Sequence, residues 1–179
     1  MSETFESVLE FWFAPGRQEV WFVKNAQFDA EIRDRFMATY EAARDGGLTA
    51  WLGRAESMLA LIIALDQFPR NMFRDDPRAF ATDRQALALT KDGIGKGFDR
   101  ELRGARLDFF YLPLMHSEVL ADHDLLATLW RGNDSHAREH RDWIVRFGRY
   151  PQRNAALGRP STPEEAEFLS SLKRGVDKD

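Results

Sequence analysis

The residues of this chain best suited to chemistry gather at the end of its most apolar segment. Residues 57–68 are almost entirely apolar, yet the last turn carries Asp66 and Gln67, with Arg70 and Asn71 just beyond. A helix that is apolar on all sides is surrounded by neighbours, so a carboxylate near its carboxyl end is partly buried and faces the unfavourable end of the helix dipole. Such a carboxylate needs a cationic partner. Asp66 is therefore either half of a structural ion pair or a group that orients a ligand.

A second polar cluster follows Pro113 and consists of His116, Ser117 and Glu118. The proline predicts a kink or an end in one helix, and Ser117 is suited to cap the next one. A junction between helices presents side chains and free amides to a cleft, so His116 or Glu118 could serve as a general acid or base. The structural alternative is that Glu118 complements a helix amino terminus and His116 bonds a carbonyl group.

Arginines dominate a third cluster, residues 146–154, which contains Arg146, Arg149 and Arg153 and ends on Asn154. Guanidinium groups at this density suit a phosphate or a carboxylate, because each can hold an anion with two parallel hydrogen bonds. The alternative is that these arginines pair with acids of the same protein, including the carboxylates of the first two clusters.

His140 lies on the inward face of the helix expected before the arginine cluster. A single histidine there is more often a core residue than a ligand, although it could meet His116 in a cleft. His136 lies four residues away, a spacing that can bind zinc with a third ligand, but the chain has only four histidines and no His-Glu-x-x-His motif. P-loop, dinucleotide-binding and nucleophile-elbow motifs are absent too. We therefore expect neither a metal nor a cofactor.

Composition and charge exclude several classes of function. The chain has no cysteine, which excludes disulfides and thiolate chemistry. Its length of 179 residues predicts one domain over residues 1–179. Residues 131–160 hold seven arginines against three acids, but the overall charge of −4 argues against nucleic acid as a partner. The longest uncharged apolar run, 58–65, is too short for a membrane span, and the chain starts acidic where a secretory signal is basic. We expect a soluble cytoplasmic protein with no membrane partner.

Helices must position these residues, because apolar residues recur at helical spacing nearly everywhere and no segment alternates with a period of two. Glycines mark helix ends at 45–47 and 93–97, and Thr162 with Glu165 forms a capping box. The expected helices span residues 4–13, 19–44, 55–68, 77–92, 99–112, 117–131, 135–147 and 163–173. Short connections between them predict an all-helical fold of about eight helices, packed as stacked antiparallel hairpins around the segment 57–68.

Four motifs in order resemble one known family. They are Leu-Asp-Gln-Phe-Pro-Arg-Asn at 65–71, Leu-Pro-Leu-Met-His-Ser-Glu at 112–118, Arg-Phe-Gly-Arg-Tyr-Pro-Gln-Arg-Asn at 146–154 and Leu-Gly-Arg-Pro-Ser-Thr-Pro-Glu-Glu at 157–165. Over about residues 5–172 the chain resembles the bacterial domain-of-unknown-function family numbered 924. The resemblance implies an all-helical fold similar to tetratricopeptide-repeat proteins, and it implies no reaction. Gln152 stands where members often have histidine, so a histidine there is not essential to this chain.

Three hypotheses follow for the function. In the first, the clusters converge on one inter-helix pocket for a small anionic ligand, a phosphate or a carboxylate, and that pocket could be an enzyme site. The candidate catalytic residues are Asp66, His116 and Glu118. The candidate ligand-binding residues are Gln67, Arg70, Asn71, His140, Arg146, Arg149, Arg153 and Asn154.

The second hypothesis is a peptide-binding or protein-binding module of tetratricopeptide-repeat type, with a concave helical surface. An open groove with exposed aromatics such as Trp21 and Trp51 would favour it, whereas a closed pocket lined by His116, His140 and arginines would favour a small molecule. The third hypothesis is that the clusters form only a buried salt-bridge network that fixes the order of the helices. The sequence sets no oligomeric state.

Overall fold

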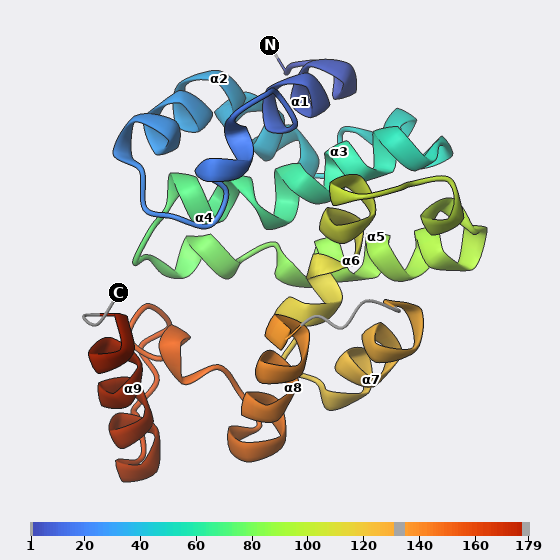
Figure 1. Ribbon diagram of the computed structural model, residues 1–179. Coiled ribbons are helices and arrows are strands. Elements are labelled where there is room, and N and C mark those ends of the chain that lie inside the picture. The colour runs from blue at the N-terminus through green and yellow to red at the C-terminus, as the bar shows by residue number, and fades with distance from the viewer. Residues whose placement is uncertain (1, 131–134, 177–179) are drawn as a thin grey trace.

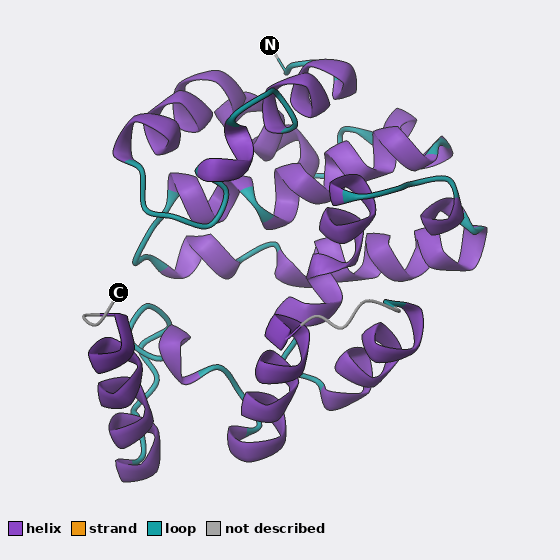
Figure 2. Cartoon of the chain, viewed as in Figure 1, coloured by secondary structure: helices purple, strands orange, loops and turns teal. Residues whose placement is uncertain are grey.

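The computed structural model describes residues 2–130 and 135–176, with side chains through residue 172. All regular structure within these residues is helical, as Figure 2 shows, which confirms the all-helical fold class. The α-helices are α1 (Phe5–Trp12), α2 (Ala26–Arg44), α3 (Ala55–Asp66), α4 (Phe68–Met72), α5 (Asp83–Lys96), α6 (Ala105–His116), α7 (Leu120–Leu129), α8 (Ser135–Phe147) and α9 (Pro163–Val176). Single turns of 3₁₀ helix span Arg17–Glu19, Thr49–Gly53, Pro77–Phe80, Phe98–Arg100 and Pro151–Arg153. None of the described helices is long and apolar enough to cross a membrane.

Helix α3 is the centre of the fold, as its apolar sequence predicts. All but one of its residues are buried, and it packs against α1, α2, α4, α5 and α6 (Figure 1). Large side chains from these neighbours, among them Trp12, Phe36, Phe68 and Phe110, are completely enclosed around it. Because a helix without a polar face is stable only when it is covered on all sides, this burial explains why five helices surround α3.

Helix α6 connects this core to the carboxyl-terminal helices. It packs on α3 and α5 at one side and on α7 and α8 at the other, and α9 lies beyond them beside the turn Pro151–Arg153 (Figure 1). The last turn of α6 therefore lies where the two groups of helices meet. His116 is the final residue of that turn.

Several helix boundaries differ from the sequence prediction. Helix α2 begins at Ala26 rather than at residue 19, because Asn25 caps it by accepting a hydrogen bond from the Phe28 amide at 3.0 Å. The residues before it form an irregular loop, in which the Trp21 indole donates to the Trp12 carbonyl at 2.9 Å. The helix expected at 77–92 is a 3₁₀ turn followed by α5, which continues past Gly93 and ends at Lys96, with Gly97 as its cap.

The second half of the chain shows a larger shift. The helix expected at 99–112 spans 105–116, so Pro113 lies inside α6 and does not end it. Ser117 does not cap α7, which begins at Leu120; its hydroxyl instead donates to Asp122 at 2.6 Å. The capping box of α9 is confirmed, since Thr162 and Glu165 each bond the other's backbone amide, at 3.2 and 2.8 Å.

Gly93 allows α5 to approach its neighbours closely. A Cβ atom at this position would lie 2.5 Å from Cζ of Phe110 and 2.7 Å from Sδ of Met58. We expect Gly93→Ala to lower the free energy of unfolding by about 1–3 kcal/mol, because an added methyl group overpacks the core. Gly95→Ala is the matched control: nothing lies within 4 Å of its Cβ, so replacing a helical glycine should stabilise the protein by roughly 0.5–1 kcal/mol. Urea unfolding followed by circular dichroism measures both, and stabilisation by Gly93→Ala would contradict this packing.

Candidate functional site

Asp66 and His116 form the centre of the candidate site. Asp66 ends α3 with its side chain enclosed, and His116 ends α6, so the packing of these two helices brings the residues together although 50 positions separate them. The Nδ1 atom of His116 lies 2.8 Å from Oδ1 and 2.9 Å from Oδ2 of Asp66. Gln67 donates its amide to Oδ2 at 2.5 Å, and Nη1 of Arg70 lies 3.3 Å from Oδ1. The cationic partner that the sequence required for Asp66 is therefore present.

These contacts keep Asp66 ionised. Burial by itself would raise the pKa of its carboxyl group, but the charge of Arg70 and the contacts with His116 and Gln67 outweigh burial and hold the pKa well below its ordinary value. An ionised carboxylate can only accept hydrogen bonds, so the proton between Asp66 and His116 belongs to Nδ1 of the imidazole.

His116 has a defined tautomer, and its burial favours the neutral imidazole. Burial lowers the pKa of its imidazole below 6.5; Asp66 opposes this effect, and Arg70 adds to it. With the proton on Nδ1, the lone pair of the ring is on Nε2, which is the atom that can accept a hydrogen bond or a proton. The carboxylate holds the ring in this orientation, as the acid of a catalytic triad does for its histidine.

Two predicted arginines, Arg70 and Arg153, lie behind this pair and are linked by Asp83. Arg70 binds both carboxylate oxygens of Asp83, at 2.8 and 3.0 Å. Arg153 donates to the same carboxylate at 3.1 Å and to the backbone carbonyl of His116 at 2.9 Å. Its guanidinium also stacks between the rings of Phe80 and Tyr150, with centroids at 4.8 and 4.6 Å. Both arginines are thus engaged within the protein, and they support His116 from behind.

The other residues of the third cluster lie elsewhere. Arg146 is exposed and pairs with Glu164 at 2.8 Å, and Arg149 binds Glu165 at 2.6 Å. Asn154 joins the same group, since its amide donates to Glu165 at 3.2 Å. These contacts attach α9 to the segment that precedes it.

Glu118 and Asn71 are also held by contacts outside the Asp66–His116 pair. Glu118 accepts hydrogen bonds from the Tyr150 amide at 2.8 Å and from Arg159 at 2.7 and 3.0 Å. Its burial favours a higher pKa, but Arg159 and the Tyr150 amide prevail and the pKa is lowered. Asn71 donates to buried Asp29 at 2.8 Å. The structure therefore brings together Asp66, Gln67, Arg70, His116 and Arg153, and it places Asn71, Glu118, Arg146, Arg149 and Asn154 in separate contacts.

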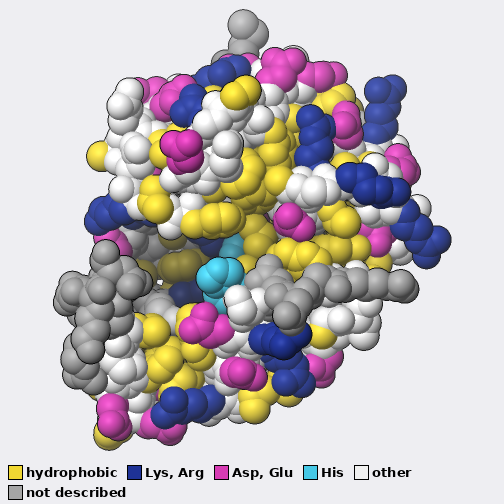
Figure 3. Space-filling view, in the orientation of Figure 1, with side chains coloured by type: hydrophobic (Ala, Val, Ile, Leu, Met, Phe, Trp, Pro, Cys, Tyr) yellow, Lys and Arg dark blue, Asp and Glu magenta, His cyan; other side chains and the backbone are white. Residues whose placement is uncertain are grey.

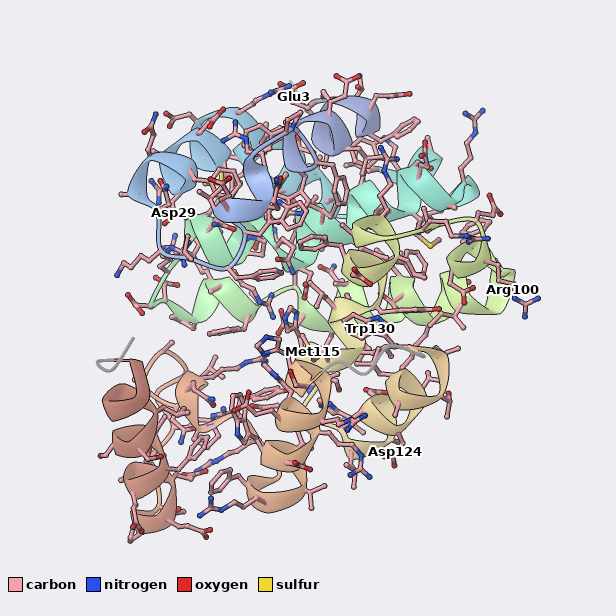
Figure 4. The ribbon with its side chains drawn as sticks, viewed as in Figure 1. Glu3, Asp29, Arg100, Met115, Asp124 and Trp130 are labelled. Atoms are coloured by element: carbon pink, nitrogen blue, oxygen red, sulfur yellow. The ribbon has the colours of Figure 1, made fainter. Side chains whose placement is uncertain are left out.

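A pocket of about 410 Å³ opens beside His116. Its walls come from the loop before α2, from α6, from the end of α7 and from the start of α8. The described lining consists of Trp21, Phe22, Ala105, Asp108, Phe109, Leu112, Met115, His116, Trp130, His136 and His140. Figure 3 shows the hollow near the centre of this face, with histidine beside hydrophobic and basic side chains, and Figure 4 labels Met115 and Trp130 where the two groups of helices meet.

His140 lines the same pocket, as its inward position predicted. Its Nδ1 atom donates to the His136 carbonyl at 2.7 Å, and its ring packs against Trp143 and Tyr150, with centroids 4.7 and 5.6 Å away. Burial, aided by the proximity of His116, lowers the pKa of His140 to about 4. His140 is therefore neutral near pH 7 and, like His116, has its lone pair on Nε2.

The sequence prediction missed the aromatic walls and Asp83. The helix expected at 19–44 includes Trp21 and Phe22, whereas the structure places them in the loop that ends at Asn25. Phe22 is 73% exposed and stacks on Phe109 at 5.9 Å. Two adjacent aromatic residues just before a helix cap are the sequence signal that could have indicated this wall. Asp83 was placed inside an expected helix but is the first residue of α5, where a carboxylate is favoured.

Comparison with known proteins places the chain in a family. It matches the family described as "Bacterial protein of unknown function (DUF924)" over residues 8–172. The chain is a member of the DUF924 family. A solved structure, described as that of a protein of unknown function from Agrobacterium tumefaciens, is 40% identical to this chain with a TM-score of 0.87, and the match covers 93% of this chain and 97% of that one. A search of the curated proteins gives no match.

The DUF924 chain has no evident metal centre in the part that the structure describes. No three His, Asp or Glu side chains of those residues come together in an arrangement that could hold a metal ion. His136 and His140 do not form a pair of ligands through their Nδ1 atoms, because Nδ1 of His140 faces the backbone carbonyl of His136.

The lowered pKa of His140 predicts a pH-dependent stability for this DUF924 protein. Between about pH 4 and pH 6.5 the unfolded chain binds a proton at His140 that the folded chain does not bind. The free energy of unfolding should therefore fall as the pH is lowered from 7 to 5, and this fall should be smaller in His140→Gln. Proton NMR of the histidine rings should show a midpoint near 4 for His140. A midpoint near 6.5, or an equal fall in the variant, would contradict the burial of this imidazole.

Proposed function

We propose that this protein binds a small organic molecule in the aromatic pocket and that His116 accepts a hydrogen bond or a proton from it at Nε2. The observation that carries the proposal is a buried His–Asp pair beside a pocket whose volume lies within the range of small-molecule sites. A concave apolar site with a few convergent polar groups and shifted pKa values is where ligands bind and where proton transfer takes place.

The surroundings of His116 support a role as a general base. If Nε2 takes a proton, the ring becomes a cation, and the ionised carboxylate of Asp66 stabilises it at 2.8 Å. Gln67 and Arg70 hold the carboxylate, and Arg153 holds the His116 carbonyl, so the imidazole need not move to react. A base that is neutral and oriented before the ligand arrives is what proton abstraction requires.

An anionic ligand held by arginines gains less support than the sequence suggested. Arg146 and Arg149 pair with Glu164 and Glu165 on α9, and Arg70 and Arg153 share Asp83. The described pocket lining includes no arginine or lysine. The small molecule therefore need not carry a phosphate or a carboxylate group.

The positions of the aromatic residues give weaker support to the peptide-binding alternative. Trp51 is buried, and Trp21 forms part of the pocket wall rather than of an open groove. Exposed Phe22 and Val23 beside the pocket are the features that would favour a macromolecular partner. Tetratricopeptide-like stacking, a single domain and a cytoplasmic location stay predictions.

A thermal-shift panel of phosphate esters, nucleotides, carboxylates, amines and alcohols tests the proposal. A ligand that binds only the folded protein stabilises it by about 2.7 kcal/mol at a hundredfold excess over Kd, and so raises Tm. We expect Ala105→Trp, which fills the pocket from the start of α6, to abolish the shift. His116→Asn should weaken it, because its amide can still donate to Asp66 but Nε2 is lost.

Arg146→Ala is the matched control, since Arg146 is exposed and lies outside the pocket lining. It should keep the full shift. A shift that survives Ala105→Trp but disappears in Arg149→Ala would overturn the proposal and place an anion site beside α9.

A further inference from the structure

The polar groups of the pocket indicate which class of ligand it takes. Resting on the function proposed above, we infer that the ligand is an organic amine, bound as its ammonium ion and attached to an aromatic or other apolar group. The hydrogen-bonding character of His116 and His140 carries this inference, together with the aromatic walls.

The two imidazoles present acceptors to the pocket. His116 and His140 each commit Nδ1–H to an oxygen of the protein, a carboxylate in one case and a backbone carbonyl in the other. Within the described residues neither Nε2 atom has a hydrogen-bond partner, and both rings line the pocket. A ligand that fits them must supply donors, because an acceptor such as a carboxylate would face two lone pairs.

The electrostatic coupling of His116 and His140 further favours a ligand that donates hydrogen bonds. His116 lies close enough to His140 to lower its pKa, so a proton on one ring disfavours a proton on the other. At neutral pH both rings are neutral, and the pocket cannot readily become a pair of imidazolium donors for an anion. An ammonium group offers three N–H bonds to these two acceptors, whereas a hydroxyl group offers one O–H.

The walls suit a cation with an apolar body. Trp21, Phe22 and Phe109 form a continuous group of rings, with Trp21 edge-on to Phe109 at 4.8 Å and Phe22 stacked on it at 5.9 Å. Trp130 contributes a further aromatic side chain from the end of α7. The faces of such rings attract cations, and aromatic cages of this kind recognise ammonium ligands. The acceptors and the rings thus agree on one ligand class.

Three ligands of matched size test the inference: 2-phenylethylamine, 2-phenylethanol and phenylacetate, each titrated into the full-length protein by isothermal titration calorimetry at pH 7. We expect the amine to bind at least about tenfold more tightly than the alcohol, since the cation–π contact and a second hydrogen bond are lost in the alcohol. Phenylacetate should bind most weakly. This ranking needs only the wild-type protein, so it does not depend on the folding of any variant.

A variant of His140 then tests whether its Nε2 atom accepts a hydrogen bond from the amine. His140→Phe removes Nε2 while keeping an aromatic ring, and it should reduce the affinity for the amine by about tenfold while changing that for the alcohol little. Arg146→Ala, outside the pocket, should leave the ranking intact.

The outcomes separate this inference from the function on which it rests. Equal binding of the three compounds, or tightest binding of phenylacetate, overturns the amine inference but leaves a functional pocket. If none of the three binds at millimolar concentration the inference is also overturned, and the broad panel with Ala105→Trp judges the pocket independently.

Discussion

The burial of one carboxylate is the constraint on which much of this structure depends. Asp66 ends the most enclosed helix, and an isolated charge in that position would cost several kcal/mol after relaxation. His116 and Arg70 come from α6 and α4 to compensate it. Removing one partner of such a buried pair typically costs about 3–5 kcal/mol, whereas an apolar replacement of the whole pair is often neutral. Stability alone therefore does not require these charges, which is consistent with a chemical role.

The compensation extends outward through alternating charges. Arg70 meets Asp83 at the start of α5, Asp83 meets Arg153, and Arg153 reaches the backbone of His116 from the far side. Helix α9 holds the turn that carries Arg153, because Glu165 accepts a hydrogen bond from Asn154, the residue that follows this turn. Residues of α3, α4, α5, α6 and the turn Pro151–Arg153 are thus linked around His116, and its orientation is the result of their packing.

The sequence allowed the central part of this arrangement to be predicted. The apolar character of residues 57–68 required a buried helix, and burial in turn required a partner for Asp66; both deductions are local and hold in the structure. Arg149 and Arg153 could not be distinguished from sequence, since both are basic and close together, yet one faces Glu165 and the other Asp83. Which of them turns inward depends on the path of the chain after α8.

The aromatic walls were missed because the helical period of the sequence extends across Trp21 and Phe22. Trp21 and Phe22 fit a helical period, and only the helix cap at Asn25 shows that the helix begins after them. The proline in α6 has the opposite effect, because tertiary packing carries the helix past a residue that usually ends one. On one side of the pocket a local cap thus decides the structure, and on the other side tertiary packing overrides the local preference.

Pro113 gives α6 a distinctive mechanical property. A proline has no amide hydrogen, so the carbonyl of Phe109 lacks its usual partner one turn further along the helix. Phe109 is itself part of the pocket wall. The axial hydrogen bonding of α6 is therefore weakest beside the pocket, although the helix packs against α3, α5, α7 and α8. The backbone beside Phe109 is therefore the part of α6 where a kink disrupts the helix least, and it is also the part that forms the pocket wall.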